Sequence, residues 1–394
     1  METNYDIGIV GGGMVGSLAA RLLSDHFKVL LLDPQQSPLP GVGEVVAHSA
    51  AGEGVPPPTL RVSALNTASC NLLETAGVLS KIAPDHLSEI LAMKVFDGDE
   101  SLAFHGSDIG QVRLGYMVEN QVLNQAILNS LPEEAVRWHH SACNHVTRHP
   151  KGFILEADDG TTHLVKLLVV AQGAMSSLRQ TLGIQLSMND YNQNAWVAHV
   201  ETEKSHSYTA YQRFLPTGTL AFLPLVNPHW SSIVWALPSS EALNPEEFAS
   251  RLYMAFPDLG PLKVLTQLAS FPLCAQNADT YSGAGFALIG DAAHTVHPLA
   301  GQGVNLGFED VARLSTVLID AQNKKEDWAS PSVLSRYAKH AKRHDERWSF
   351  GFSLINRLYQ EENPLFVAAR RFGTRRFSKM DLVKRFLMKC GVGH

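Results

Sequence analysis

Residues 290–307 read Gly-Asp-Ala-Ala-His-Thr-Val-His-Pro-Leu-Ala-Gly-Gln-Gly-Val-Asn-Leu-Gly, and this stretch decides the fold. The apolar residues 286–289 come directly before it and predict a buried strand, and the spacing after Gly303 predicts a helix to about residue 322. Asp291, at the end of that strand, can accept hydrogen bonds from a polyol, whereas glycines before a helix offer backbone amides to a negative group. The stretch therefore predicts a ligand site near the carboxyl end of the chain.

A second glycine motif lies at the opposite end, where residues 11–16 read Gly-Gly-Gly-Met-Val-Gly. It stands between an apolar run and residues of helical spacing, which predicts a strand, a tight turn and a helix. Gly11 permits the turn, Gly13 lets a pyrophosphate approach the backbone, and Gly16 lets the helix pack against its strand. A glycine turn without a ligand is the alternative.

The next predicted strand favours the ligand interpretation. Residues 28–32 read Lys-Val-Leu-Leu-Leu and are followed by Asp33. In dinucleotide-binding folds, an acidic residue at this place binds the ribose hydroxyls of the adenine half. The sequence thus predicts one adenine dinucleotide that needs both ends of the chain.

The composition excludes several classes of protein. A chain of 394 residues is expected to form two domains around one cleft. The hydrophobic share of 45% and charged share of 18% are those of a globular protein, and the net charge of -6 argues against a nucleic-acid partner. No apolar run is long enough to span a bilayer, and the first residues do not resemble a secretion signal.

The four cysteines, Cys70, Cys143, Cys274 and Cys390, are far apart and form no Cys-x-x-Cys pair. No cysteine or histidine spacing resembles a zinc site, so no metal is expected. Buried, reduced thiols in a cytoplasmic protein are the expectation.

The sequence patterns alternate between the two glycine motifs. Residues 34–58 are rich in Gly and Pro and predict a long surface loop, whereas residues 63–79 and 118–131 have helical spacing. Residues 152–170 predict strands. Short apolar segments between turn residues predict an antiparallel sheet over residues 191–271.

Four segments carry a resemblance to a known family. They are residues 61–65 (Arg-Val-Ser-Ala-Leu), 114–120 (Leu-Gly-Tyr-Met-Val-Glu-Asn), 222–225 (Phe-Leu-Pro-Leu) and 290–307. Together they resemble the ubiquinone-biosynthesis hydroxylases, a group of flavin-dependent aromatic hydroxylases of the p-hydroxybenzoate hydroxylase type. The resemblance covers nearly the whole chain.

This resemblance implies a mixed α/β fold. We expect a discontinuous Rossmann-like FAD-binding domain, an inserted antiparallel-sheet substrate domain and a C-terminal helical, basic segment. The FAD-binding domain is predicted over residues 1–75, 105–185 and 275–345. The substrate domain is predicted over residues 76–104 and 186–274, and the C-terminal segment over residues 346–394.

The resemblance also implies which residues bind FAD. The adenosine diphosphate half would be held by Gly11, Gly13, Gly16 and Asp33. Arg61 and Asn120 would approach the pyrophosphate and the ribityl chain, which Asp291 would also bind. The isoalloxazine ring would be bordered by Pro298, Gly301, Gly303, Val304 and Asn305.

The implied reaction is the hydroxylation of a polyprenyl quinol or phenol with O2 and NAD(P)H. The nicotinamide donor reduces FAD, oxygen adds to give a C4a-hydroperoxide, and one oxygen atom passes to an electron-rich ring carbon. Two alternatives stay open: a flavin dehydrogenase or reductase without oxygen insertion, and a non-catalytic FAD-containing subunit of a ubiquinone-synthesis assembly.

Two histidines of the second glycine motif invite different interpretations. His297 can accept or relay the phenol proton of the substrate. The alternative, which we weigh equally, is that His297 only positions neighbouring groups. His294 is expected to be structural and to bond to the backbone near the strand end.

The aromatic residues of the predicted antiparallel sheet are Tyr211, Phe214, Phe222 and Trp235. They are candidates for a quinol pocket, but for any one of them we favour a place in the core.

This chain departs from the family pattern at two positions. Gln172 stands before Gly173 where the family normally has Asp, which puts the binding and preference of the nicotinamide donor in question. Thr59 stands two positions before Arg61, where relatives commonly carry an acid.

The end of the chain is strongly basic. Residues 365–394 hold eight Lys and Arg against the single Asp381, a net charge of +7. Apolar residues alternate with these cations, which predicts an amphipathic helix on the inner face of the cytoplasmic membrane. A helix packed on its own domain, on a second copy of the chain or on another ubiquinone-biosynthesis protein is the alternative.

Overall fold

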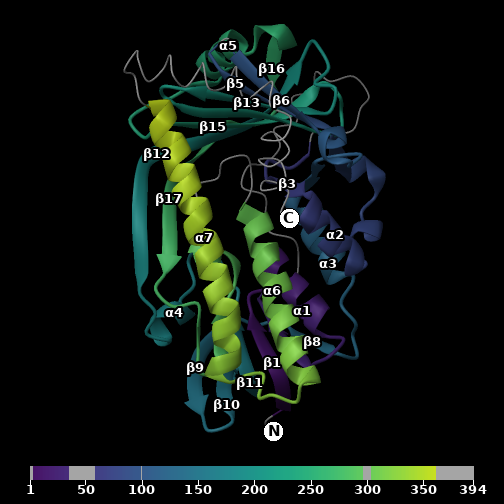
Figure 1. Cartoon of the computed structure of the whole chain (residues 1–394), viewed down its shortest axis with the longest axis vertical. Helices are drawn as coiled ribbons and strands as arrows, with labels where there is room; N and C mark the ends of the chain where they lie inside the picture. The colour runs from purple at the N-terminus through teal and green to yellow at the C-terminus, as the bar shows by residue number, and fades with distance from the viewer. Residues whose placement is uncertain (1–2, 35–57, 99, 296–302, 361–394) are drawn as a thin grey trace.

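The computed structural model describes residues 3–34, 58–98, 100–295 and 303–360, with side chains to Asp345. Two large sheets form the molecule, and Figure 1 shows the mixed sheet in its lower half and the antiparallel sheet at its top. There is also a small three-stranded sheet, and the long helix α7 (Pro331–Gln360) runs from the antiparallel sheet down to the mixed sheet (Figure 1). The predicted mixed α/β fold, with a Rossmann-like sheet and an antiparallel sheet, is confirmed. No helix of the described residues is long and apolar enough to cross a membrane.

The mixed sheet has the strand order β18-β19-β11-β1-β2-β8, and β10 and β9 extend it from β11. Its strands are β1 (Thr3–Val10), β2 (Val29–Leu32), β8 (Val136–His139), β9 (Cys143–His149), β10 (Gly152–Ala157), β11 (Thr162–Val170), β18 (Ser282–Gly283) and β19 (Phe286–Leu288). The five strands from β19 to β8 are parallel, so their carboxyl ends meet at one edge of the sheet. Ligands of open α/β sheets bind at this edge.

The described residues contain seven α-helices. They are α1 (Met14–Leu23), α2 (Thr67–Thr75), α3 (Asn120–Leu128), α4 (Leu178–Thr181), α5 (Pro245–Ala255), α6 (Gly303–Asn323) and α7 (Pro331–Gln360). Short 3-10 turns are η1 (Leu79–Lys81), η2 (Pro84–His86), η3 (Gly106–Ile109), η4 (Pro257–Leu259) and η5 (Gly290–Ala292). The predicted helix that starts at Gly303 is thus α6, and it packs beside α1 and α7 (Figure 1).

The antiparallel sheet has the order β20-β17-β12-β15-β14-β13-β5-β6, and β16 pairs with β12. Its strands are β5 (Ala92–Asp97), β6 (Glu100–His105), β12 (Leu186–Thr202), β13 (Thr209–Leu215), β14 (Gly218–Pro224), β15 (Trp230–Pro238), β16 (Leu262–Val264), β17 (Ala269–Ala278) and β20 (His294–Thr295). All described pairs are antiparallel except β13 with β5. The antiparallel sheet predicted over residues 191–271 is therefore confirmed.

A three-stranded sheet corrects two of the predicted helices. It consists of β3 (Val62–Asn66), β7 (Gly115–Glu119) and β4 (Leu87–Ile90). The helix predicted over 63–79 begins only at Thr67, because residues 62–66 pair with β7 and the Asn66 side chain accepts from Ser69 N at 2.9 Å to cap the helix. The helix predicted over 118–131 likewise begins at Asn120, since residues 118–119 end β7.

The aromatic side chains of the antiparallel sheet belong mainly to its core. Phe222 and Trp235 are buried, and their rings contact those of Phe256 and Phe248. Tyr211 packs against the same cluster, with its ring centroid 6.0 Å from that of Phe256. The core interpretation is confirmed for these three residues.

The expectation of buried thiols is confirmed for Cys70 and Cys143, whereas Cys274 is half-buried. Cys70, Cys143 and Cys274 are free thiols, and the first two are buried. Burial raises the pKa of Cys70 to about 12 and that of Cys143 to about 11, which makes both thiols poor nucleophiles at neutral pH. Cys390, the interior of the loop predicted at 34–58 and the basic segment 365–394 lie outside the described residues.

Candidate active site

A cavity of about 670 Å³ opens at the carboxyl edge of the parallel sheet. The predicted FAD-binding residues that line it are Gly11, Gly13, Asp33, Arg61, Asn120, Asp291, Gly303 and Val304. Segments from both ends of the chain thus meet around one space, as the two glycine motifs predict. Gly16 and Asn305 lie behind its wall, and the predicted residues His297, Pro298 and Gly301 lie outside the described part of the chain.

The first glycine motif forms a tight turn against the neighbouring strand. Gly11 has φ +112°, and a Cβ there would lie 2.3 Å from the carbonyl oxygen of Ala171. A Cβ at Gly16 would lie 1.9 Å from the carbonyl oxygen of Gly11. Only glycine fits either position, so α1 can begin directly behind the end of β1.

Gly13 is the part of this turn that faces the cavity. It is the N-cap of α1, no side chain caps the helix, and a Cβ at Gly13 would have no atom within 4 Å. The first turn of α1 also holds no acidic residue. The helix therefore presents open backbone amides and its positive end to the cavity, which suits a pyrophosphate.

Asp33 ends the second strand and stabilises the glycine turn. Its Oδ2 accepts a hydrogen bond from Gly12 N at 2.6 Å. The carboxylate is thereby oriented on the wall of the cavity, next to the glycine motif. This is the place where a ribose would meet an acceptor.

The opposite wall comes from β3 and the start of α3. Asn120 N donates to Arg61 O at 3.0 Å, and the Asn120 Oδ1 accepts from Ser63 Oγ at 2.7 Å. Thr59 N and Oγ1 both donate to Glu119 Oε2, at 2.8 and 2.9 Å. Glu119 therefore holds the segment before Arg61, which explains how Thr59 is accommodated without an acid of its own.

Asn124 is a cavity residue that sequence reasoning missed. It lies one turn after Asn120 on α3 and is buried, yet its Oδ1 has no hydrogen-bond partner within the described parts of the chain. A buried acceptor without a partner is unfavourable unless a ligand supplies the donor. The available signal was a polar residue on the buried face of α3, next to Leu123 and Ile127.

The second glycine motif places Asp291 on the cavity wall through the turn η5. Removal from bulk water raises the pKa of the Asp291 carboxyl, and the nearby His294 partly offsets this effect. Arg179, which is buried, fixes the turn by donating from Nη1 to the carbonyl oxygens of Ala292 at 3.1 Å and Asp291 at 3.4 Å. Sequence reasoning gave Arg179 no such role.

Asn305 joins the start of α6 to the small sheet. Its Oδ1 accepts from Asn66 N at 3.0 Å, and its Nδ2 donates to Ala64 O at 2.7 Å. Both bonds connect residues more than 200 positions apart, with separations of 239 and 241. They hold Gly303 and Val304 at the cavity, so Asn305 acts on the site by positioning its neighbours.

The predicted hydrogen bond of His294 to the backbone is wrong, because its side chain bonds to a carboxylate instead. Its Nε2 bonds to Asp310 Oδ2 at 2.6 Å and lies 3.6 Å from Asp345 Oδ2, with all three residues buried. Burial alone would lower the pKa of His294, but the carboxylates, Asp310 foremost, raise it to about 9. Asp310 Oδ2 also accepts from Gly290 N at 2.9 Å, so the ion pair anchors the turn that carries Asp291. The prediction failed because the partner is a carboxylate on α6, 16 residues away.

The charge on His294 predicts a loss of stability at high pH. The folded-state pKa of about 9 exceeds the ordinary value of 6.5, so the stabilisation is complete below about pH 6.5 and disappears as the pH rises through 9. We expect the free energy of unfolding to fall by on the order of 3 kcal/mol between these limits. Urea titrations at several pH values measure this fall, and a flat profile from pH 6.5 to 10 would contradict a buried imidazolium.

Gln172, the larger departure from the family pattern, lines the cavity beside Gly173. Its Oε1 accepts from Ser176 Oγ at 2.8 Å and from Leu178 N at 3.4 Å. The amide oxygen thus holds the segment before α4, as a carboxylate oxygen would, but without the negative charge.

These observations fit the adenine dinucleotide FAD. The open amides at Gly13, the oriented carboxylate of Asp33 and the unpaired Oδ1 of Asn124 match a pyrophosphate, ribose hydroxyls and a donor of the same ligand. The 3-demethoxyubiquinol 3-hydroxylase of Escherichia coli (strain K12) is 33% identical to this chain over 98% of both sequences. A family model for an FAD binding domain matches residues 4–349. The chain belongs to the FAD-dependent monooxygenases.

Other relatives support the same membership. The monooxygenase is 34% identical to ubiquinone hydroxylase UbiL of Rhodospirillum rubrum, over 98% of this chain and 89% of the relative. It is 30% identical to ubiquinone biosynthesis monooxygenase COQ6 of Caenorhabditis elegans, over 99% and 96%. The crystal structure of p-nitrophenol 4-monooxygenase from Pseudomonas putida shares its fold with a TM-score of 0.77 at 20% sequence identity, covering 98% of this chain and 97% of the other.

Proposed function

We propose that this monooxygenase hydroxylates the ring of a polyprenyl benzoquinol or phenol in ubiquinone biosynthesis, with O2 and NAD(P)H as co-substrates. The substrate we favour is 2-octaprenyl-3-methyl-6-methoxy-1,4-benzoquinol. The proposal is supported mainly by the sequence identity of 33% with a 3-demethoxyubiquinol 3-hydroxylase, over 98% of both chains. A cytoplasmic protein that reaches its substrate at the inner face of the membrane is part of the same proposal.

When bound, FAD supplies the redox chemistry that transfers one oxygen atom from O2 to the ring. In this chain Gly13 and the start of α1 would hold its pyrophosphate, and Asp33 the ribose. Arg61, Asn120 and Asn124 would line the central part, and Asp291 would accept from the ribityl hydroxyls. Gly303, Val304 and the start of α6 would border the ring system, with Pro298 and Gly301 beside them.

Proton transfer from the substrate phenol is assigned to His297. A neutral imidazole near the ring would accept this proton and make the ring carbon a better nucleophile. The substrate ring would lie between the two sheets, where the two predicted domains meet. The FAD-binding domain is predicted over residues 1–75, 105–185 and 275–345, and the substrate domain over residues 76–104 and 186–274.

Oxygen labelling tests the reaction class. Purified protein with FAD, NAD(P)H and the benzoquinol is expected to incorporate one atom of 18O from 18O2 into the product. Label from water, or product without label, would instead support a flavin dehydrogenase. Flavin that the donor cannot bleach would support the non-catalytic subunit.

The variant Gln172→Asp tests whether the replacement of the family's aspartate by Gln172 affects reduction by the nicotinamide donor. The carboxylate keeps an acceptor for Ser176 Oγ and restores the charge of the family, so we expect flavin reduction by NAD(P)H to become several-fold faster. Stopped-flow absorbance under anaerobic conditions measures this rate. Gln180→Asp, an exposed change on α4, is the control, and an unchanged rate in Gln172→Asp would remove the explanation.

The variant Asn124→Leu tests whether the Asn124 Oδ1, which has no described hydrogen-bond partner, accepts a hydrogen bond from FAD. Because Asn124 Oδ1 has no partner in the described structure, its loss should leave the melting temperature unchanged or raise it. FAD affinity should fall about tenfold through the loss of one hydrogen bond. Fluorescence titration of the apoprotein measures the affinity, with the exposed Gln125→Leu on the same helix as control. Equal affinity of the two variants would exclude a contact with the cofactor.

A further inference from the structure

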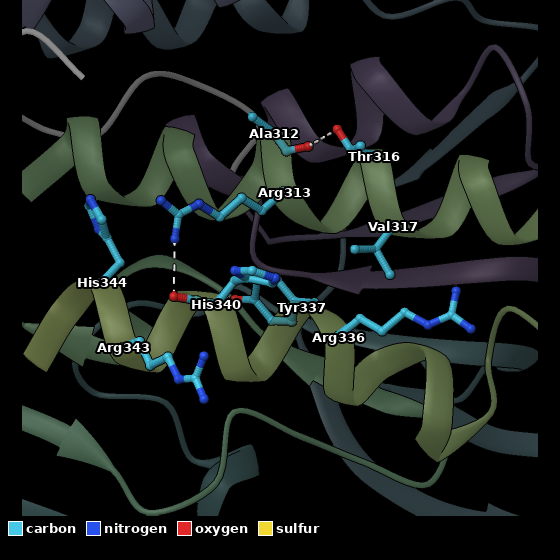
Figure 2. A pocket seen from close by; sticks show the side chains of 9 residues that line it. All are labelled: Ala312, Arg313, Thr316, Val317, Arg336, Tyr337, His340, Arg343 and His344. Atoms are coloured by element: carbon cyan, nitrogen blue, oxygen red, sulfur yellow. Dashed lines mark hydrogen bonds between the residues drawn. The ribbon is translucent and has the colours of Figure 1, made fainter. Parts of the chain in front are cut away.

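A second cavity, of about 690 Å³, lies between the sides of α6 and α7 and shares no lining residue with the flavin cavity. Figure 2 shows its residues coming from the two helices alone. The charged residues that line it are all cationic or able to become so, namely Arg313, Arg336, His340, Arg343 and His344. We refer to this cavity as the α6–α7 groove.

Two of the three arginines that line the groove are paired with glutamates. Glu309 pairs with Arg313 and with His344, whose Nε2 lies 3.3 Å from its Oε2. Glu326 pairs with Arg336 at 2.6 Å. A third carboxylate, the buried Asp345, has its Oδ1 3.9 Å from His344 Nδ1. Of the three arginines that line the groove, Arg313 and Arg336 therefore have glutamate partners, whereas no ion pair is described for Arg343.

Arg343 is the arginine of the groove that could pair with an added anion. It is exposed, and in the described part of the chain its guanidinium makes no ion pair or hydrogen bond. The His340 side chain, one turn earlier on α7, is also exposed and has no partner among the described residues, while its backbone carbonyl accepts from Arg313 Nη1 at 3.2 Å (Figure 2). Donors for an anion are therefore available on one side of the groove.

The floor of the groove is apolar. Ala312 and Val317 are half-buried on α6, and Tyr337 is buried on α7. The lining residues lie within the two helices, well away from their first turns, so side chains and no helix N-terminus supply the charge. A cationic rim over an apolar floor suits a ligand with a phosphate and an aliphatic part better than a free inorganic anion.

A second cluster of cations lies further along the sequence, beyond α7. α7 ends at Gln360, and residues 365–394 carry the net charge of +7. Residues 345–364 separate this basic stretch from the groove, and they hold four acidic residues against two arginines. Clusters of Lys and Arg beside such grooves bind anionic lipid head groups.

We propose that the α6–α7 groove binds the phosphate head group of an anionic phospholipid and thereby orients the protein on a membrane. The proposal does not depend on which ring is hydroxylated. According to this proposal, the folded helices α6 and α7 provide a membrane contact of their own, besides any contact made by the basic segment 365–394.

The test uses full-length, FAD-loaded protein and phosphatidylcholine vesicles with or without phosphatidylglycerol. We compare the double variant Arg336→Gln with Arg343→Gln against a control of equal charge loss on the same helix, Lys339→Gln with Lys342→Gln. Both lysines are exposed and lie outside the groove lining. Co-sedimentation measures the dissociation constant, and the flavin spectrum verifies the fold.

Binding to anionic vesicles is expected to weaken about fivefold for each arginine, hence on the order of twentyfold for the groove double variant. The lysine control should lose clearly less. Equal losses in the two double variants would show unspecific attraction and overturn the proposal. If the groove double variant fails to keep FAD, Arg343→Gln alone, which breaks no described ion pair, should still bind about fivefold more weakly.

Competition with inorganic phosphate distinguishes a lipid head group from a soluble phosphate as the ligand of the groove. We expect no release of the protein from vesicles by phosphate beyond that caused by a chloride salt of equal ionic strength. Specific release by phosphate, or tight phosphate binding without vesicle binding, would show a site for a soluble anion and would contradict a lipid ligand.

Discussion

Gly13→Ala is expected to yield a well-folded protein that has lost most of its affinity for FAD. A Cβ at this position meets no atom within 4 Å, and Gly13 has φ -68°, which alanine adopts without strain. The added methyl group would stand in front of the amides of α1, where phosphate oxygens must approach. Loss of two charge-assisted hydrogen bonds corresponds to about 3 kcal/mol, or on the order of a 100-fold rise in the dissociation constant.

The control for Gly13→Ala is Gly77→Ala. Gly77 has φ +70° and also has open space around a Cβ, so alanine there brings backbone strain of about 1 kcal/mol without touching the cavity. We expect Gly77→Ala to lower the melting temperature and to keep FAD, the reverse of Gly13→Ala. Fluorescence titration and thermal melts measure both properties. A Gly13→Ala protein that binds FAD within threefold of the native affinity would disprove the assigned pyrophosphate position.

Asp310→Ala is expected to be the most destabilising of the substitutions considered. It leaves the His294 imidazolium buried without its 2.6 Å partner and removes the acceptor of Gly290 N. Breaking a buried ion pair by removing one partner costs about 3–5 kcal/mol. Because the same carboxylate anchors the turn before Asp291, FAD content should fall together with stability.

Asp320→Ala is the matched control on the same helix. Asp320 forms an exposed pair with Lys324 at 2.7 Å, and pairs of this kind contribute only about 0–1 kcal/mol. Denaturant titration of the two variants should therefore differ by at least about 2 kcal/mol. Similar stability of the Asp310 and Asp320 variants would mean that the buried cluster does not hold the turn.

Local patterns were sufficient to predict the parallel sheet and the cavity. The glycines of residues 11–16 and the aspartates at 33 and 291 follow apolar strands, and parallel strands bring their carboxyl ends together. Such features depend on short stretches of chain, each of which carries its own periodicity. The parallel sheet and the meeting of the two glycine motifs could therefore be predicted from the residues, whereas the full fold class was implied by the family resemblance.

Partnerships between distant residues could not be predicted in this way. The pair of His294 with Asp310, the clamp from Asn305 to β3, and the bonds of Arg179 each depend on how helices pack across the sheet. A helical pattern does not show which polar residue will face a buried partner. The start of α2 was also misplaced, because pairing of residues 62–66 with β7 overrides their helical spacing.

The flavin cavity is lined by Gly11 near the start of the sequence and by Gly303, which lies 292 positions later. A ribosome must therefore release the first 304 residues before the prosthetic group can be captured. Until then the newborn chain lacks the stabilisation that a tightly held ligand adds to the native state. Cells short of riboflavin should consequently degrade this protein faster, so that vitamin supply controls its abundance as well as its catalytic turnover.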